Sequence, residues 1–118
     1  MARPRKWKKV CCMPEISLFG PINAVNANNE IIIMAIEEYE TIRLIDFEGL
    51  TQEQCSEKMK VARTTVQGLY SSARNKLSHS LVDGKVLRIE GGDYKLYDDS
   101  ERGHGCGRCR RRRRGQNM

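Results

Sequence analysis

The chain has few aromatic residues and no long run of apolar residues. Aromatic side chains make up 6% of its 118 residues, so we expect a core built mostly from aliphatic side chains. No apolar run approaches the roughly 18 residues that a membrane-spanning helix requires. The basic N-terminus lacks the apolar segment of a secretory signal. These absences predict a cytoplasmic protein that has no membrane partner.

The motifs of common catalytic sites are also missing. The sequence contains no glycine-rich phosphate loop, no HExxH motif and no arrangement of a nucleophile with a base. The carboxylates of residues 37–48 have the spacing of a solvated or partner-facing helix. The length suggests a single domain, too short to hold a cofactor domain plus a substrate domain. We therefore expect no enzymatic activity and no required cofactor.

Acidic residues are absent between Glu57 and Asp83, whereas five basic residues lie there: Lys58, Lys60, Arg63, Arg74 and Lys76. A surface that approaches DNA needs this segregation, because an interposed carboxylate would repel the phosphates. Residues 10–101 as a whole contain nine basic and fifteen acidic residues, so the net charge of +6 comes from two basic tails. Such tails bind polyanions or keep a protein soluble, and both interpretations stay open.

Residues 51–77 have the pattern of two short helices joined by a tight turn. Thr51 and Gln54 form a capping box for the first helix, which we expect to end near Lys60. The second helix is predicted from about Arg63 to Leu81, because its apolar residues recur at steps of three and four. That inner stripe is Val66, Leu69, Tyr70, Ala73 and Leu77, and the opposite side carries Arg63, Gln67, Ser71, Arg74 and Ser78. A helix-turn-helix of this kind places its second helix in the major groove of DNA.

Three further elements are expected around this motif. Residues 31–34 form a strand candidate, and residues 36–48 form a helix that Gly49 ends. The many carboxylates of that helix indicate that it faces away from DNA. Residues 86–97 alternate as a β-hairpin around Gly91-Gly92, which would pair Ile89 with Tyr94 and Leu87 with Leu96.

The predicted fold class is therefore mainly α with a small β component. It is a helix-turn-helix domain, similar to a winged helix, with a short N-terminal strand and a C-terminal β-hairpin. The domain spans residues 16–98. A basic N-terminal arm (residues 1–15) precedes it, and a disordered tail rich in cysteine and arginine (residues 99–118) follows.

The five cysteines suggest one candidate metal site. Their number is odd and no export signal is visible, so a disulfide framework is not expected. Cys106 and Cys109 form a CxxC whose thiolates could share zinc or iron. His104 is a candidate third ligand, and Cys11 and Cys12 would contribute if the two chain ends meet. The alternative is a flexible tail with free thiols.

A resemblance to a known family rests on the segments RPRKWKKVCCMP, EEYETIRLIDFEGLTQEQC, VARTTVQ, SARNKL and GKVLRIEGGDY. They are similar to those of small prokaryotic proteins of unassigned role, which are predicted to bind DNA through a helix-turn-helix like region 4 of sigma-70 factors. The resemblance spans most of residues 3–97 and implies a winged or hairpin-decorated fold. It implies that Arg63, Thr64, Thr65 and Gln67 reach base edges and that Arg74 lies near phosphate. Two departures are Ala62, which replaces the usual capping serine, and Gly68, which occupies a position where a basic or polar side chain is common.

The predicted function is sequence-specific binding of double-stranded DNA by a transcriptional regulator. Arginine can bind guanine bidentately and glutamine can bind adenine in the same way. The expected contacts to DNA are Arg63, Thr64, Thr65, Gln67 and Ser71 in the groove, and Lys58, Lys60, Arg74 and Lys76 on the phosphates. RNA polymerase or a second copy of the chain are further candidate partners. The alternatives are a metal- or redox-responsive regulator that uses the CxxC, or an RNA-binding or protein-interaction module that uses the arginine-rich tail.

Overall fold

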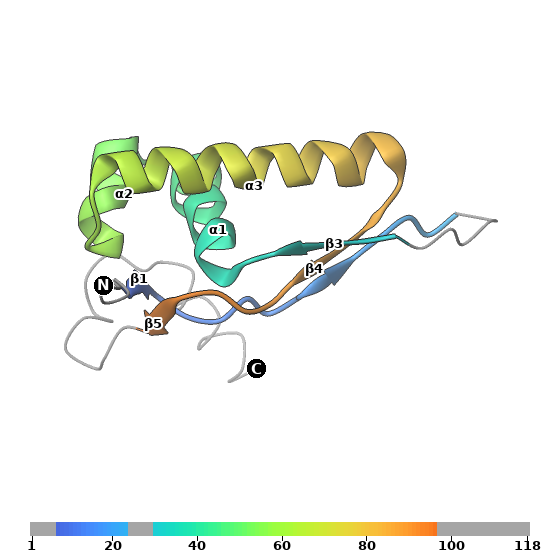
Figure 1. The fold of residues 1–118 in the computed structure, drawn as a ribbon, viewed down its shortest axis with the longest axis horizontal. Helices are drawn as coiled ribbons and strands as arrows, with labels where there is room; N and C mark the ends of the chain where they lie inside the picture. The colour runs from blue at the N-terminus through green and yellow to red at the C-terminus, as the bar shows by residue number, and fades with distance from the viewer. Residues whose placement is uncertain (1–6, 24–29, 97–118) are drawn as a thin grey trace, which may run out of the picture.

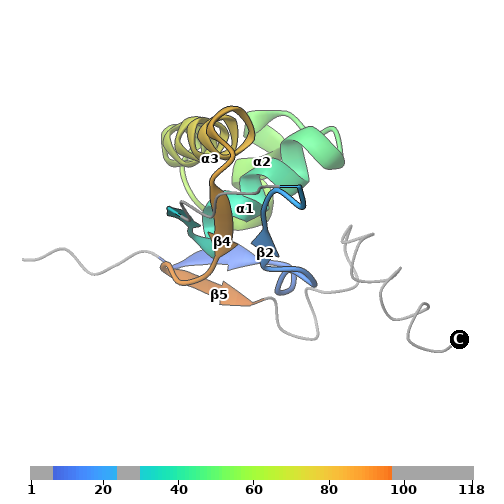
Figure 2. The ribbon, with the colours of Figure 1, turned by 90° about the vertical axis from the view of Figure 1, so that its right-hand side faces the viewer.

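The computed structural model describes residues 7–23 and 30–96. In this part of the chain the helical segments are α1 (Ile36–Thr41), η1 (Ile42–Phe47), α2 (Gln52–Met59) and α3 (Arg63–Asp83), and the strands are β1 (Lys8–Val10), β2 (Leu18–Phe19), β3 (Ile31–Met34), β4 (Val86–Ile89) and β5 (Tyr94–Leu96). The fold is thus a mixed one in which helices form one layer and short strands the other (Figures 1 and 2). No helix of the described residues combines the length and the apolar character needed to cross a membrane.

The helical part follows the sequence prediction closely. α1 continues into η1, a π-helical segment in which the Glu48 amide donates to the Arg43 carbonyl, five residues back, at 2.9 Å. Gly49 then ends this helix with φ of +84°. The capping box at the start of α2 is present, because the Gln54 amide donates to Thr51 Oγ1 at 3.1 Å and the Thr51 amide donates to Gln54 Oε1 at 2.9 Å.

A tight turn joins α2 to α3. Lys60 ends α2 in a left-handed conformation with φ of 58°, and Val61 turns into the core. α3 begins after Ala62, which provides no side-chain cap. The turn between the two helices therefore lies where the sequence predicts it, and the missing cap is a local weakness of about 0.5–2 kcal/mol.

The strands pair differently from the prediction. β4 lies in the middle of a three-stranded sheet, with β2 antiparallel on one edge and β3 parallel on the other, and β5 pairs in parallel with β1. The predicted hairpin of β4 and β5 is therefore wrong. Both edges of β4 are occupied, so no edge is left for β5.

Gly91 and Gly92 carry the chain past the start of α1 instead of folding it back. The Gly91 carbonyl accepts from the Ile36 amide at 2.9 Å, and the Asp93 amide donates to Glu37 Oε2 at 3.0 Å. A side chain at Gly92, where φ is +113°, would collide with the Glu37 carboxylate. The two glycines therefore lead the chain to a position where β5 pairs with β1. β1 belongs to the part of the sequence predicted to be an N-terminal arm.

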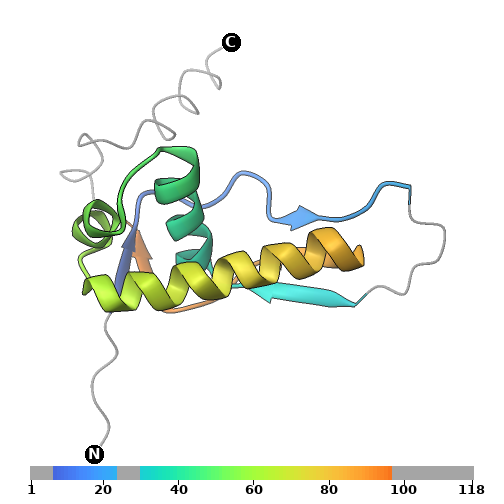
Figure 3. The same ribbon diagram turned by 90° about the horizontal axis from the view of Figure 1, so that it is seen from above.

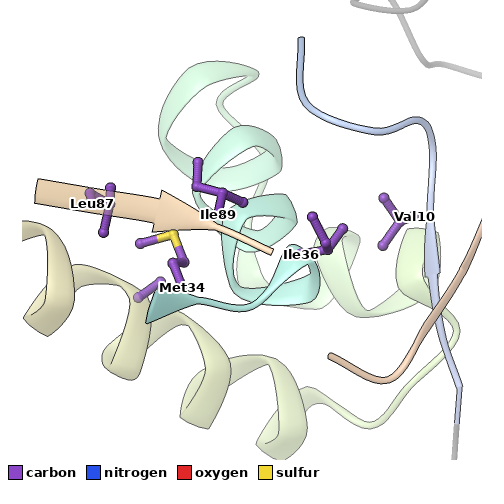
Figure 4. Packing of buried hydrophobic residues seen from close by; sticks show 6 residues of the cluster. Val10, Met34, Ile36, Leu87 and Ile89 are labelled. Atoms are coloured by element: carbon purple, nitrogen blue, oxygen red, sulfur yellow. The ribbon is translucent and has the colours of Figure 1, made fainter. Parts of the chain in front are cut away.

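The core consists of two clusters of aliphatic residues. The first lies between the strands and the helices α1 and α3, and comprises Val10, Met34, Ile36, Ala73, Leu87 and Ile89 (Figure 4). The second lies where η1, α2 and α3 meet, and comprises Leu44, Cys55, Met59, Val61 and Val66. Seen from above, α3 runs over the strip between β2 and β3 (Figure 3). It contributes Ala73 to the first cluster and Val66 to the second.

Candidate nucleic-acid interface

The N-terminal half of α3 presents most of the predicted DNA contacts on one exposed side. Val66 and Ala73 are fully buried on the inner side. Four predicted contacts on the outer side are exposed: Arg63, Gln67, Ser71 and Arg74. Thr64 is exposed and Thr65 is half-buried beside them. The helical repeat alone produces this arrangement, because residues separated by three or four positions share a face.

Arg63 and Gln67 have unoccupied polar groups. They lie four residues apart, about one helical turn. Within residues 7–23 and 30–96 neither side chain forms a hydrogen bond or an ion pair. No carboxylate of α3 lies near them, because the first acidic residue of that helix is Asp83. Their donors and acceptors are therefore available to a ligand.

Arg74 is partly neutralised by a small cluster with Tyr70 and Asp46. Arg74 Nη1 donates to the Tyr70 hydroxyl at 3.1 Å, and this hydroxyl donates to Asp46 Oδ1 at 2.7 Å. Arg74 Nε lies 3.9 Å from Asp46 Oδ2, and the guanidinium stacks 5.4 Å from the Tyr70 ring centre. The hydrogen bond to Asp46 raises the pKa of Tyr70 above its ordinary value. Asp46 thus brings one negative charge to the edge of an otherwise basic surface.

The three lysines predicted to hold phosphates occupy different surroundings. Lys60 is exposed at the turn between α2 and α3, and Lys58 is half-buried in the last turn of α2. Lys76, in contrast, donates to Glu38 Oε1 at 2.7 Å. Its charge is already compensated by α1, so it is poorly available for a phosphate contact.

Three carboxylates of α1 are buried, which corrects the expectation of a solvated or partner-facing helix. Glu37, Glu38 and Glu40 expose 5%, 6% and 0% of their surface. Each binds a different part of the fold, because Glu37 accepts from the Asp93 amide, Glu38 from Lys76, and Glu40 from the Cys11 amide at 3.2 Å. These side chains act as internal hydrogen-bond acceptors and do not form a solvated face.

Glu38 connects α1 to α3 through Lys76 and Ser72. Burial would raise the pKa of Glu38, but hydrogen bonds from Lys76, Ser72 and a backbone amide lower it below its ordinary value. The carboxyl group is therefore ionised at neutral pH and fixes the middle of α3.

Sequence reasoning missed Asp46, Tyr70 and Glu38 as determinants of this surface. Tyr70 precedes Arg74 by four residues, and this helical spacing is a usable signal for contact. Asp46 lies 24 residues before Tyr70 in the sequence. Glu38 lies 38 residues before Lys76. Only the fold brings these pairs together, so no local pattern could have revealed them.

The predicted metal ligands His104, Cys106 and Cys109 lie outside the described residues. Cys11 is buried and Cys12 is half-buried, and both are disulfide-bonded. This corrects the expectation that no disulfide forms, since a cysteine count contains no information on which sulfurs a fold brings together. Zinc and iron bind thiolates, so these two residues are no ligands in this state. Within residues 7–23 and 30–96, no three metal-ligating side chains gather.

Cys55 is a free thiol inside the second cluster. Burial raises its pKa to about 12. The residue is therefore part of the core, as the inner side of its helix predicts, and it is poorly suited to redox or nucleophilic chemistry.

Comparison with known proteins identifies relatives along most of the chain. Residues 1–97 match the family model described as "Protein of unknown function DUF134". The chain is 58% identical over 115 residues to a UPF0251 protein of Desulfitobacterium hafniense (strain Y51), a match that covers 97% of this chain and 90% of the relative. It is 46% identical over 105 residues to a UPF0251 protein of Caldanaerobacter subterraneus subsp. tengcongensis, which covers 89% of each. No solved structure shows significant similarity. The chain therefore belongs to the prokaryotic DUF134/UPF0251 family.

Proposed function

We propose that the protein binds double-stranded DNA in a sequence-specific way and regulates transcription. α2, the turn at Lys60–Ala62 and α3 form the helix-turn-helix in this proposal, and residues 63–78 enter the major groove. One observation carries it. Arg63 and Gln67 are exposed one turn apart and have no partner within the described residues, while Val66 between them anchors the helix in the core.

The chemistry of this pair suits base recognition. The guanidinium of Arg63 can donate two hydrogen bonds to guanine, and the amide of Gln67 can donate to and accept from adenine. Thr64, Thr65 and Ser71 add short hydroxyl side chains that reach bases or sugars. In this proposal the N-terminal half of α3 reads neighbouring base pairs.

The positive charges around the helix would position it on the phosphates. Lys58 and Lys60 lie at the end of α2 and in the turn, beside the N-terminus of α3. Arg74 lies about three turns further along the same side of α3. Phosphate contacts of this kind fix register and add affinity without sequence preference. Lys76 contributes little, because Glu38 holds its ammonium group.

Substitution of Arg63 tests the base-reading role. Selection of bound fragments from randomised duplex DNA should first yield a consensus for the unaltered chain. Arg63→Ala should then lose about 1–3 kcal/mol of discrimination at one base pair, because a bidentate contact is removed. Binding constants of consensus and point-altered duplexes measure this loss.

Lys85→Ala is the matched control, since Lys85 carries the same charge but pairs with Glu30 at 3.0 Å beside β4. It should leave sequence preference unchanged. Equal losses on every duplex for Arg63→Ala would contradict base reading. Stronger binding of structured RNA than of duplex DNA by the full chain would favour the RNA-binding alternative.

A second function, a response to redox state or metal, is favoured by the disulfide-bonded state of Cys11 and Cys12. A dithiol reductant would reduce the disulfide bonding of Cys11 and Cys12 to thiols and would itself become oxidised to a disulfide. The freed thiolates could then bind zinc or iron. Metal analysis of the chain before and after reduction, without chelator, tests this proposal. Less than one metal ion per reduced chain would reject metal binding.

A further inference from the structure

The three-stranded sheet has one face that no described element covers. In β4, Leu87 and Ile89 point toward the helices and are buried, so Val86 and Arg88 point to the other face by alternation. The register places Ile31 beside Val86, and places Leu18 and Ile33 on either side of Arg88. We call the residues Leu18, Ile31, Ile33, Val86 and Arg88 the outer sheet face. α3 lies along the opposite face (Figure 1).

This face is more apolar than a solvated sheet surface. Leu18, Ile31 and Ile33 expose 56%, 43% and 42% of their surface. β3 is the unbroken apolar run Ile-Ile-Ile-Met, a pattern typical of strands that are buried on both faces. Its inward residue Met34 is buried as this pattern predicts, whereas its outward residues are open. Contiguous exposed apolar surface of this kind marks an interaction site.

The remaining segments of this chain are chemically unsuited to cover the face. They read MARPRK (residues 1–6), AVNANN (residues 24–29) and YDDSERGHGCGRCRRRRRGQNM (residues 97–118). Large apolar side chains are scarce in them, and charged side chains dominate the last one. Covering apolar surface requires apolar surface in return. These segments offer little such surface, so a cover from another molecule fits this face better.

The charges on β4 indicate that this molecule is a second copy of the chain. Arg88 lies on the outer sheet face. Glu90 directly follows β4, and its amide donates to the Met34 carbonyl at 2.9 Å, so the alternation of the strand continues and places Glu90 on the side of Arg88. Neither side chain forms an ion pair within the described residues. A two-fold axis that sets two β4 strands antiparallel would bring each Arg88 against the Glu90 of the other copy. A surface of this kind is self-complementary, as an isologous interface requires.

We propose that the outer sheet face is the interface of a homodimer, in which two sheets pack face to face. Stable interfaces bury about 800 Å² on each partner. The exposed parts of Leu18, Ile31 and Ile33 form the apolar centre of this interface. Because α3 covers the opposite face of the sheet, this dimer leaves the exposed side of both α3 helices free.

Sedimentation equilibrium of the full chain, without DNA, tests the interface independently of DNA binding. The unaltered chain should sediment as a dimer of the 13.5 kDa protomer. Ile33→Lys should raise the dimer Kd at least about 30-fold, because it places a charge in the centre of the apolar face. Leu81→Lys is the matched control, since Leu81 is exposed on α3, away from this face, and should not change the Kd.

A monomer at all concentrations up to about 100 µM would overturn the proposal, because no interface of useful strength would exist. A dimer that Leu81→Lys breaks and Ile33→Lys leaves intact would also overturn it. A charge exchange keeps the test decisive if Ile33→Lys fails to fold. Arg88→Glu should weaken the dimer at least tenfold, and the double variant Arg88→Glu, Glu90→Arg should restore it. Failure of the double variant to restore the dimer would refute the proposed pairing.

Discussion

The two halves of α3 rest on very different supports. The N-terminal half packs through Val66 and Leu69 on η1, α2 and the turn, all from the preceding 20-odd residues of the chain. The C-terminal half packs through Ala73 and Leu77 on β3, β4 and the end of β1, which come from three separate parts of the chain. One continuous helix thus joins a locally formed motif to a sheet that depends on long-range pairing.

This difference has consequences for stability and for function. The proposed base contacts Arg63 and Gln67 lie on the half with local support, where the outer side carries polar residues with few internal partners. The other half is tied to α1 and to the sheet, and there Lys76 is already paired with Glu38. α3 can therefore be held rigidly at one end while its other end remains available to a ligand.

The largest effect on stability is expected from the buried ion pair Glu40–Arg43. This pair lies between η1, which supports the N-terminal half of α3, and the end of β1, which supports the C-terminal half. Arg43 Nε and Nη2 donate to the Glu40 carboxylate at 2.9 and 2.8 Å, and the two side chains expose 4% and 0% of their surface. Removal of one partner leaves the other charge buried without compensation. Arg43→Ala should therefore destabilise the protein by about 3–5 kcal/mol, measured by urea unfolding.

The shape of that transition distinguishes one folding unit from two. Glu40 also accepts a hydrogen bond from the Cys11 amide next to β1. An uncompensated charge on Glu40 should therefore destabilise the packing at the end of β1 as well as at η1. A single shifted transition by circular dichroism would indicate that the halves of α3 unfold together. Arg74→Ala, which removes a guanidinium 63% exposed on the same helix, is the control and should cost at most about 1 kcal/mol. Equal costs for the two variants would contradict the role of the buried pair.

A smaller effect is expected from pH, through the contact that ties Glu38 to the C-terminal half of α3. Hydrogen bonds from Lys76 and Ser72 outweigh burial and lower the pKa of Glu38 in the folded state. The unfolded chain therefore takes up this proton at a higher pH than the folded protein does. The stability that Glu38 contributes is present above the ordinary pKa of a glutamate and is lost as pH falls below it.

Glu38→Gln tests this assignment. Urea midpoints measured from pH 7 to pH 3 should fall less steeply for this variant than for the unaltered chain. Glu53→Gln, which changes an exposed glutamate at the start of α2, should leave the pH profile unchanged. The same pH profile for Glu38→Gln and the unaltered chain would show that Glu38 is not the group responsible.

The same division explains what could be predicted from the sequence. Helical periodicity, the capping box at Thr51 and the glycine at position 49 are local signals, and they located α2, the turn and α3 correctly. Strand pairing is not local. The alternation of residues 86–97 fits a hairpin, yet β2 and β3 occupy both edges of β4 before β5 can pair with it.

The candidate site divides in the same way. The exposed side of α3 follows from a spacing of three and four residues, so Arg63, Gln67 and Ser71 could be placed from the sequence. The partners of Arg74 and Lys76 could not, because Asp46 and Glu38 reach them only through the packing of α1 and η1 against α3. Charge patterns therefore predicted the positions of basic residues but not which of them are neutralised.

The smallest effect is expected at the boundary between the two halves, where Asp46 holds Arg74. Asp46→Asn removes the negative charge and leaves a side chain of the same shape, so Arg74 keeps its stacking on Tyr70 but loses its counter-charge. If α3 approaches DNA with this side, the affinity should rise by a factor of about two to five, since exposed pairs contribute at most about 1 kcal/mol. The rise should be equal on all sequences, because a phosphate contact carries no base preference.

Fluorescence anisotropy with labelled duplexes of several sequences, at several salt concentrations, measures the affinity and its dependence on sequence and salt. The variant should show a steeper dependence of log K on log salt, by a little under one unit, because Arg74 then displaces one more counterion from the DNA.

The pKa of Tyr70 gives a readout that needs no DNA. It should fall toward its ordinary value in Asp46→Asn, because the hydrogen bond to Asp46 is the main cause of its increase. A fall in this pKa with no change in affinity or salt slope would place Arg74 outside the interface and would confine DNA contact to the first turns of α3.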